Sequence, residues 1–595
     1  MEKLLIACLC LALFACDSKT KESEKKKEVP AQDFEQFKLD YIDAMWAMNP
    51  ISASYQGLHK YDDQLPILNE ERKQKGLDFS KEWLNKLNDF NYESLSELDK
   101  IDYHLMDDNL SSTDFYTNEF KGGEWNPSSY NLGGAFFQVI NYQGNDLNDR
   151  LEALSKKLDK VQAYYQQAQQ NIQKPTEVHV RLAVQQLEGS KSIFEKTLAD
   201  SLAVSSKDDA FKEAFTVKLE VAVEAIDAYK NFLQIEFLDK SEDSTTFRSF
   251  RIGEDLFAKK SNSQIQSAYS AKEIFEAAVE EKEDLHEKLY RLSEMLWEKY
   301  HGDKEKPGGR FEQIQMVIDA VAKTHVHRDS FVTAIRQQIP ELIAFVNDND
   351  LIALDAKKPL VVRETPEYMR GFAGASISAP GPYDADAETY YNVTPLDHYS
   401  EEEAESYLRE YNNFTLQILN IHEAIPGHYT QLVYSNQSPS LIKSILGNGA
   451  MIEGWAVYTE KMMLENGYGG DNIEMGLMYY KWNLRTVCNT ILDYGVHVMN
   501  YTEEDAMQLL MKEAFQEKSE AEGKWRRARL SQVQLCSYFT GYYEIMQLRS
   551  EIQERLGEAF NLKSFHEEFL SYGSAPVKYI RKLMIGKLDQ EGKPA

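Results

Sequence analysis

"AKEIFEAAVEEKEDLHEKLYRLSEMLWEKY", residues 271–300, decides the fold class, because its apolar side chains recur every three or four positions with charges between them. This period places the apolar side chains on one face of an α-helix. Ser270 directly precedes the stretch and is a favourable N-cap residue. The stretch therefore predicts a long amphipathic helix that buries one face.

The same periodicity recurs along much of the chain, in the stretches 34–58, 151–173 and 210–234. Ser94 with Glu97 three residues later has the capping-box spacing and predicts a further helix start. We therefore predict a mainly α fold.

One segment departs from the helical pattern. Residues 359–395 are rich in Pro, Gly, β-branched residues and Tyr, which indicates short strands and turns. Helices resume after Ser400, which is followed by acidic residues typical of a first helical turn. We place a boundary near residue 350, between an N-terminal helical half (31–350) and a catalytic half (351–595) that contains the small β segment.

Composition excludes one class of partner. The chain has 595 residues, of which 43% are hydrophobic and 27% charged, as in a globular protein with a large core. The net charge of -30 argues against nucleic-acid binding, which requires a basic surface.

The N-terminus has the features of an export signal. Residues 1–15 combine a Lys with a short apolar run and a small residue before Cys16, a pattern that resembles the bacterial lipobox. The resemblance implies cleavage before Cys16, lipidation of its thiol and a membrane anchor in the cell envelope, on the periplasmic side or outer surface. Residues 16–30 form a polar tether. The alternative is an ordinary signal peptide. Cys488 and Cys536 remain in the mature chain and could pair.

A possible metal site begins with "IHEAIPGHYT", which starts at Ile421. His422 and His428 are six residues apart, and His nitrogen is a preferred zinc ligand. Six residues of a straight helix advance by about 600° and about 9 Å, so the two side chains would lie roughly 120° apart. A continuous helix therefore cannot place both histidines on one ion.

The Pro-Gly pair between the histidines provides a break. Pro426 lacks an N–H and its ring clashes with the carbonyl four residues earlier, and Gly427 has wide backbone freedom. We predict that the helix is interrupted near Ile425 and that His428 folds back beside His422.

A carboxylate further along the chain could complete the site. "MIEGWAVYTEKMM", which starts at Met451, offers Glu453 and Glu460, and residues seven apart share one helical face. The apolar run before His422 indicates a buried helix, in which unpaired polar groups are unfavourable. A lone His-Glu pair is nevertheless common on solvated helices, so the metal site stays a hypothesis at this point.

"HEAIPGHYTQ" followed by "EGWAVYTE" resembles the bacterial domain-of-unknown-function 885 family, and the similarity covers nearly the whole mature chain. That family is similar to zinc metallopeptidases with a Glu ligand. The resemblance implies a mainly helical, two-lobed body with a deep cleft, and zinc (Zn2+, one per chain) on His422, His428 and Glu453. It also implies that Glu423 is the general base. Glu460, on the same helical face as Glu453, is placed to hold a ligand histidine through its other ring nitrogen.

The family's later blocks contain candidates for the remaining chemistry. His497 or Tyr538 could stabilise the oxyanion, and Asp493, four residues before His497, could orient its imidazole. A purely structural His-Asp pair is the alternative. Arg527 could bind a substrate carboxylate, although "KWRRAR" also fits a solvated basic patch.

"YYNVTP", residues 390–395, could lie along the cleft as an edge strand. Tyr391 and Asn392 would then bind an extended peptide.

These observations predict a zinc metallopeptidase that hydrolyses peptide bonds, most readily those of short peptides. One alternative is a zinc amidase that acts on non-peptide or cell-wall amides. The other is a non-catalytic helical binding lipoprotein, which requires no metal and is indifferent to changes at Glu423.

Overall fold

The computed structural model describes residues 32–358, 360–365, 374–379, 381–383, 388–438 and 440–591. The predicted signal peptide (1–15), the lipidation site Cys16 and the polar tether (16–30) lie outside the described residues.

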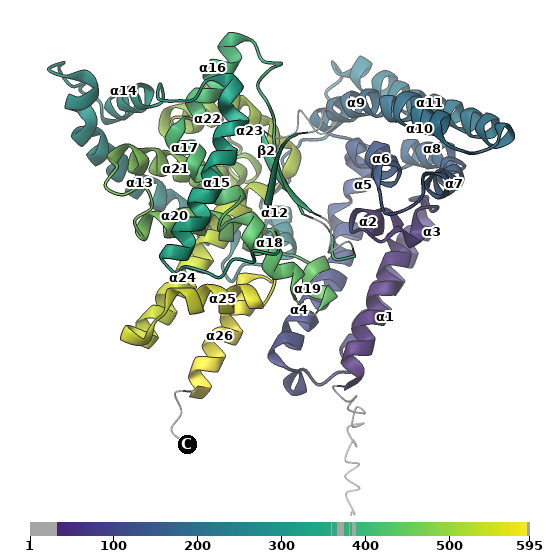
Figure 1. Ribbon diagram of the computed structural model, residues 1–595. Helices are drawn as coiled ribbons and strands as arrows, with labels where there is room; N and C mark the ends of the chain where they lie inside the picture. Colours follow the sequence, from purple (N-terminus) through teal and green to yellow (C-terminus); the bar gives the residue numbers. More distant parts are fainter. Residues whose placement is uncertain are drawn as a thin grey trace, which may run out of the picture.

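The described residues before Ser270 are helical, and their amphipathic stretches form the helices that periodicity predicts. In Figure 1 the helices α6 to α11 gather at the right of the view. The helices are α1 (Gln32–Met48), α2 (Pro50–Tyr55), α3 (Glu70–Leu87), α4 (Glu97–Asp114), α5 (Gly122–Trp125), α6 (Gly133–Asn141), α7 (Leu147–Leu158), α8 (Val161–Asn171), α9 (Glu177–Ser192), α10 (Ala199–Val204), α11 (Asp209–Glu236) and α12 (Gly253–Gln264).

The remainder is also mainly helical, and its helices lie at the left and bottom of Figure 1. They are α13 (Ala271–His301), α14 (Arg310–Val321), α15 (Phe331–Asp348), α16 (Glu401–Glu410), α17 (Asn413–Glu423), α18 (His428–Asn436), α19 (Leu441–Ile445), α20 (Gly449–Glu465), α21 (Ile473–His497), α22 (Glu503–Met507), α23 (Lys518–Ser531), α24 (Ser537–Leu556), α25 (Leu562–Ser571) and α26 (Val577–Glu591).

The predicted β segment forms a small mixed sheet between α15 and α16. Its strands are β1 (Leu360–Glu364), β2 (Ala375–Ser378) and β3 (Thr389–Val393), in the order β1-β3-β2. β3 pairs in parallel with β1 and antiparallel with β2. The mainly α fold with a small β segment is confirmed.

Helix caps show how local sequence defines the helix ends. Ser270 and Ser400 each form a complete capping box with the Glu three residues later, as predicted. The predicted start at Ser94 is wrong, because Ser94 ends a short 3-10 turn. Ser96 is the N-cap of α4, and its side chain accepts a hydrogen bond from the Asp99 amide. Sequence placed the helix start correctly to within two residues, and the neighbouring serine makes the cap.

The described hydrophobic core is not divided at residue 350. The largest apolar cluster combines α1, α4, α13, α14 and α15 with α17, α20, α21, α24 and the last two helices. A second cluster lies among α6, α7, α8, α9 and α11. The predicted boundary near 350 therefore does not separate two cores, since helices from both sides of it bury their apolar faces together.

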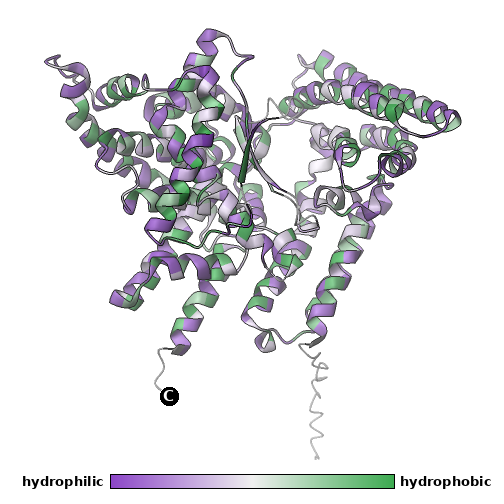
Figure 2. Ribbon diagram, viewed as in Figure 1, coloured by the Kyte–Doolittle hydropathy of each residue, from purple (hydrophilic) through white to green (hydrophobic). Residues whose placement is uncertain are grey.

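The helices alternate hydrophobic and hydrophilic positions along their length (Figure 2). This is the pattern of helices that turn one face to a core and the other to solvent. Within the described ranges, no helix is long and apolar enough to cross a membrane.

Candidate metal centre

The backbone breaks between the two histidines as predicted. α17 ends at Glu423 and α18 begins at His428. The chain turns sharply in between, and the Gly427 amide donates to the Ile421 carbonyl at 3.0 Å. A Cβ atom on Gly427 would lie 1.9 Å from the carbonyl oxygen of His422, so only glycine fits. The Pro-Gly turn therefore returns His428 to the end of the helix that carries His422.

Three side chains converge at this turn. One ligand atom from each of His422, His428 and Glu453 lies within 4.8 Å of the other two. The Oε2 atom of Glu453 is 3.8 Å from Nε2 of His422 and 3.4 Å from Nε2 of His428. The two imidazole rings are nearly perpendicular, at 84°, with centroids 4.7 Å apart. Three potential ligand atoms thus face one small volume.

The helix that supplies Glu453 is fixed by unusually close packing. Gly454 of α20 lies against Gly541 of α24, and a Cβ on either would meet backbone atoms of the other helix. Trp455 donates its indole N–H to the carbonyl of Pro426 at 3.0 Å, which ties α20 to the Pro-Gly turn. α20 therefore holds both a ligand candidate and the backbone of the turn.

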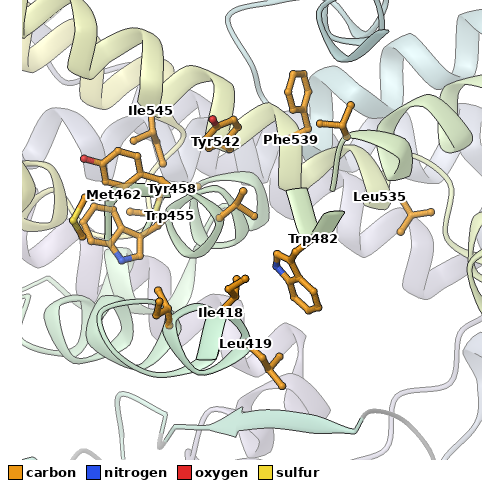
Figure 3. Close-up of a cluster of buried hydrophobic side chains, with 14 of the residues drawn as sticks. Ile418, Leu419, Trp455, Tyr458, Met462, Trp482, Leu535, Phe539, Tyr542 and Ile545 are labelled. Atoms are coloured by element: carbon orange, nitrogen blue, oxygen red, sulfur yellow. The ribbon is translucent and has the colours of Figure 1, made fainter. Parts of the chain in front are cut away.

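A dense apolar cluster surrounds these helices (Figure 3). Side chains from α17, α20, α21 and α24 meet there, and all are buried. The labelled members from these helices are Ile418, Leu419, Trp455, Tyr458, Met462, Trp482, Phe539, Tyr542 and Ile545. Close-packed interiors resist small displacements, so the cluster gives the site a rigid frame.

Glu460 contacts His422 through the ring nitrogen Nδ1, as the sequence predicts. Its Oε1 atom lies 2.7 Å from Nδ1 of His422, and Trp482 donates its indole N–H to the same oxygen at 3.0 Å. This contact orients the imidazole and leaves Nε2 of His422 directed toward Glu453. Burial alone would lower the pKa of His422, but the Glu460 hydrogen bond and the charges of Glu460, Glu423 and Glu453 raise it to about 9.

Glu423 lies beside the ligand candidates in the last turn of α17. Burial raises its pKa, while the charges of His428 and His422 oppose the shift. Among the described residues, none donates a hydrogen bond to its carboxylate, which remains partly exposed. Glu423 is therefore available to accept a proton from a molecule bound at the cluster.

The donor set fits a zinc ion. Two imidazole nitrogens and one carboxylate oxygen, with space for a water, are the ligands of many catalytic zinc sites. The charges of three carboxylates, those of Glu423, Glu453 and Glu460, act on His422, and this excess of negative charge favours a cation. Nδ1 of His428 is buried without a hydrogen-bond partner among the described residues, so this imidazole lacks an orienting contact.

The contact between Glu460 and His422 gives the first testable expectation. Glu460→Gln should lower zinc affinity by about 10–100-fold, because outer-shell hydrogen bonds to a ligand histidine contribute that much. Competition with a chromophoric zinc chelator measures the affinity. Glu465→Gln, on the same helix but paired at the surface with Arg549, is the control and should leave affinity unchanged. Equal affinities of the two variants would show that Glu460 does not support a metal ligand.

Tyr538 and Arg527 lie near the cluster, on α24 and α23. Arg527 donates from Nη2 to the Tyr538 hydroxyl at 3.1 Å and to Gln534 at 2.6 Å. Burial and the charge of Glu453 raise the pKa of Tyr538, so its hydroxyl keeps its proton. The Arg527 charge in turn helps to lower the pKa of Glu453. Both residues therefore lie within electrostatic reach of the candidate ligands.

His497 is not available as an oxyanion donor in this structure. It is 1% exposed, and its Nε2 atom lies 2.8 Å from the carbonyl oxygen of Ala528. Asp493 does not orient it through a hydrogen bond, since their closest atoms are 3.6 Å apart. Instead, an Asp493 oxygen accepts from the Leu535 amide at 3.0 Å. Both residues therefore have structural contacts, His497 with the backbone of α23 and Asp493 with the connection between α23 and α24.

That connection needs support, because Gln532 and Val533 both have positive φ angles, 25° and 69°. A β-branched residue rarely adopts this conformation. Val533 is β-branched, so position 533 carries a side chain that this backbone does not favour. Asp493 stabilises the turn that separates Arg527 from Tyr538.

The predicted peptide-binding strand is also corrected. β3 is the central strand of its sheet, so it has no free edge for a substrate. Tyr391 is fully buried and donates its hydroxyl to Asn420 at 2.9 Å. The Asn392 side chain bonds Arg363 and Ser378. Neither side chain is therefore available to bind a peptide. The prediction was wrong because the sequence gives a strand's composition but not its place in the sheet.

Sequence reasoning missed Trp482 and Lys524. Trp482 could have been noticed as a tryptophan within the apolar helix 473–497. Its contact with Glu460 joins two different helices, so no regular spacing in the sequence indicates it. Lys524 lies in "KWRRAR" and is buried, unlike its exposed neighbour Arg526. Lys524 and Arg527 are three residues apart and therefore share a helical face, which was the only indication in the sequence that they could act together.

Cys488 and Cys536 are both free and buried.

Together the fold and the site define a mainly helical protein with a partly buried His-His-Glu cluster. The family described as "Bacterial protein of unknown function (DUF885)" matches residues 50–584. The chain therefore belongs to the DUF885 family, as its motifs indicated.

Solved structures are also similar to this chain. One, described as "a putative lipoprotein of unknown function from Shewanella oneidensis", is 51% identical with a TM-score of 0.87, over 93% of this chain and 99% of that one. Another, described as "the putative lipoprotein from Colwellia psychrerythraea", shares the fold at 17% identity with a TM-score of 0.76, over 94% of this chain and 99% of that one. No curated protein matches the chain.

Proposed function

We propose that this protein is a zinc-dependent metallopeptidase that hydrolyses peptide bonds, preferentially in short peptides. The observation that carries the proposal is the convergence of His422, His428 and Glu453 within 4.8 Å, beside the partly exposed carboxylate of Glu423. Two imidazoles brought together by a break between helices, with a carboxylate beside both, make up the donor set of a catalytic zinc site.

The residues divide the chemistry among them. His422, His428 and Glu453 would hold a zinc ion, which would lower the pKa of a bound water to about 7 and polarise the scissile carbonyl. Glu423 accepts a proton from the attacking water and returns it to the leaving amine. Tyr538 accepts from Arg527, and its O–H, which donates to no acceptor within the described ranges, would donate to the carbonyl oxygen. Glu460 holds His422 in position.

The proposal extends to the location of the protein. We propose a lipid-anchored protein of the cell envelope, cleaved before Cys16. Support comes from the lipobox-like N-terminus and from the 51% identical relative, whose name contains "putative lipoprotein".

Metal content and activity of the soluble chain test the proposed function. The chain from about residue 24 should bind roughly one zinc ion, and His428→Ala should lose most of it, because one of three ligands is removed. Elemental analysis after dialysis measures the metal, and a mixed oligopeptide panel followed by mass spectrometry measures cleavage. His327→Ala, at an exposed histidine, is the control.

The outcomes separate the alternatives. Zinc binding without cleavage of any peptide in the panel would favour an amidase with another substrate. Absence of zinc in the wild-type chain would favour a binding lipoprotein and contradict the proposal.

A further inference from the structure

α23 carries two cations, Lys524 and Arg527, within electrostatic reach of Glu453. Glu520, Lys524 and Arg527 are four and three residues apart, so they share one face of the helix. Glu520 is neutralised by Arg485 of α21, with an ion-pair distance of 2.7 Å. Lys524 is 6% exposed, and the nearest Glu520 oxygen is 3.9 Å from its Nζ atom, too far for a hydrogen bond.

Neither cation has a hydrogen-bonded carboxylate partner among the described residues. Arg527 donates to two neutral groups, Gln534 and Tyr538. Burial and the charge of Arg485 lower the pKa of Lys524 to about 7, and the charge of Glu520 only partly opposes this shift. A buried charge is strongly unfavourable unless it is paired. The missing partner on this face is an anion.

The nearest remaining acid cannot supply it. Glu453 acts electrostatically on both Lys524 and Arg527, so the three groups lie close together. In the proposed function, however, Glu453 is a metal ligand and its charge is compensated there. Lys524 and Arg527 would then be uncompensated beside the point where a peptide is cleaved.

We propose that Lys524 and Arg527 form a subsite for a carboxylate of the substrate, and that this carboxylate is the free C-terminus of the peptide. The inference rests on the proposed function and makes the protein a C-terminal exopeptidase. An ammonium and a guanidinium give charge-assisted hydrogen bonds to a carboxylate, which neutral peptide groups cannot match. Tyr538, bonded to Arg527, links the subsite to the scissile carbonyl.

Binding of small peptides tests the subsite without turnover. The probes are N-acetyl-Ala-Ala and its C-terminal amide, titrated by calorimetry into the Glu423→Gln variant. The acid should bind about 10–100-fold more tightly than the amide, the range expected for hydrogen bonds to a charged group. Lys524→Met should remove most of this preference. Lys518→Met, at an exposed lysine of the same helix, should keep it.

Each outcome bears on the proposal. Equal affinity for acid and amide in the parent protein, including undetectable binding of both, would overturn it, as would a preference that survives Lys524→Met. The comparison of acid and amide in the parent protein leaves Lys524 and Arg527 unchanged, so it remains decisive if Lys524→Met fails to fold. Because no hydrolysis is measured, a failed peptide-cleavage assay counts against the proposed function and not against the subsite.

A third probe distinguishes the source of the carboxylate. N-acetyl-Ala-Asp-amide has a carboxylate only in its side chain. It should bind as weakly as the neutral amide. Binding as tight as that of N-acetyl-Ala-Ala would overturn the assignment to the C-terminus, because the subsite would then take an acidic side chain.

Discussion

Glu423→Gln is expected to lower kcat/KM for peptide hydrolysis by about 10²–10⁴-fold, the usual contribution of a general base, while zinc remains bound. The amide has nearly the shape of the carboxylate but cannot accept the proton of the attacking water. Zinc is retained because the candidate ligands are His422, His428 and Glu453 and do not include position 423. Steady-state cleavage with metal content measured on the same sample checks both halves of the expectation.

The control separates a local chemical effect from a general change in charge. Glu402→Gln removes an exposed carboxylate in the first turn of α16 and should leave both quantities unchanged. Full activity of Glu423→Gln would refute the role of this residue. Loss of zinc in that variant would instead show that Glu423 helps to hold the metal.

The parts of this site that sequence predicted are those governed by local geometry. Helical arithmetic excluded a continuous helix between His422 and His428 and identified Pro426-Gly427 as the break, and the structure contains that break. The seven-residue spacing of Glu453 and Glu460 likewise places both on one face of α20, where each reaches His422. Such inferences depend only on the period of the helix.

The parts that sequence could not predict depend on where a helical face points. Asp493 and His497 share a face, but that face lies against α23, where His497 meets a backbone carbonyl. Spacing says that two side chains are neighbours and does not say what lies opposite them. Tyr391 and Asn392 illustrate the same limit for a strand, since pairing on both edges is decided by other segments of the chain.

Burial of charge was the other feature hidden in the sequence. "KWRRAR" has the composition of a solvated basic patch, and Arg526 is exposed in that way. Lys524 is buried because α21 and α23 pack together, and it lacks a close carboxylate because Arg485 pairs with Glu520. Arg485 and Lys524 both lie near Glu520, but Arg485 is on another helix, so sequence spacing does not indicate this arrangement.

Gly427→Ala should disrupt the metal site although it removes no side-chain contact. The new Cβ would lie 1.9 Å from the His422 carbonyl oxygen and 2.3 Å from that of Ile421. Both oxygens belong to the backbone of α17, so neither can rotate away as a flexible side chain could. The turn must open, and the start of α18, which carries His428, must move away from His422.

Gly427→Ala should lower zinc affinity by at least the factor of about 10–100 that is expected for loss of a hydrogen bond to a ligand histidine. The effect should be this large because the change displaces a ligand itself. Overpacking of this kind should also lower the free energy of unfolding by about 1–3 kcal/mol. Chelator competition and denaturant unfolding measure the two effects. Gly449→Ala is the matched control, because its Cβ would meet nothing within 4 Å at the start of α20, the helix that carries Glu453. Zinc affinities that agree between the two variants would show that the close approach at Gly427 does not position His428.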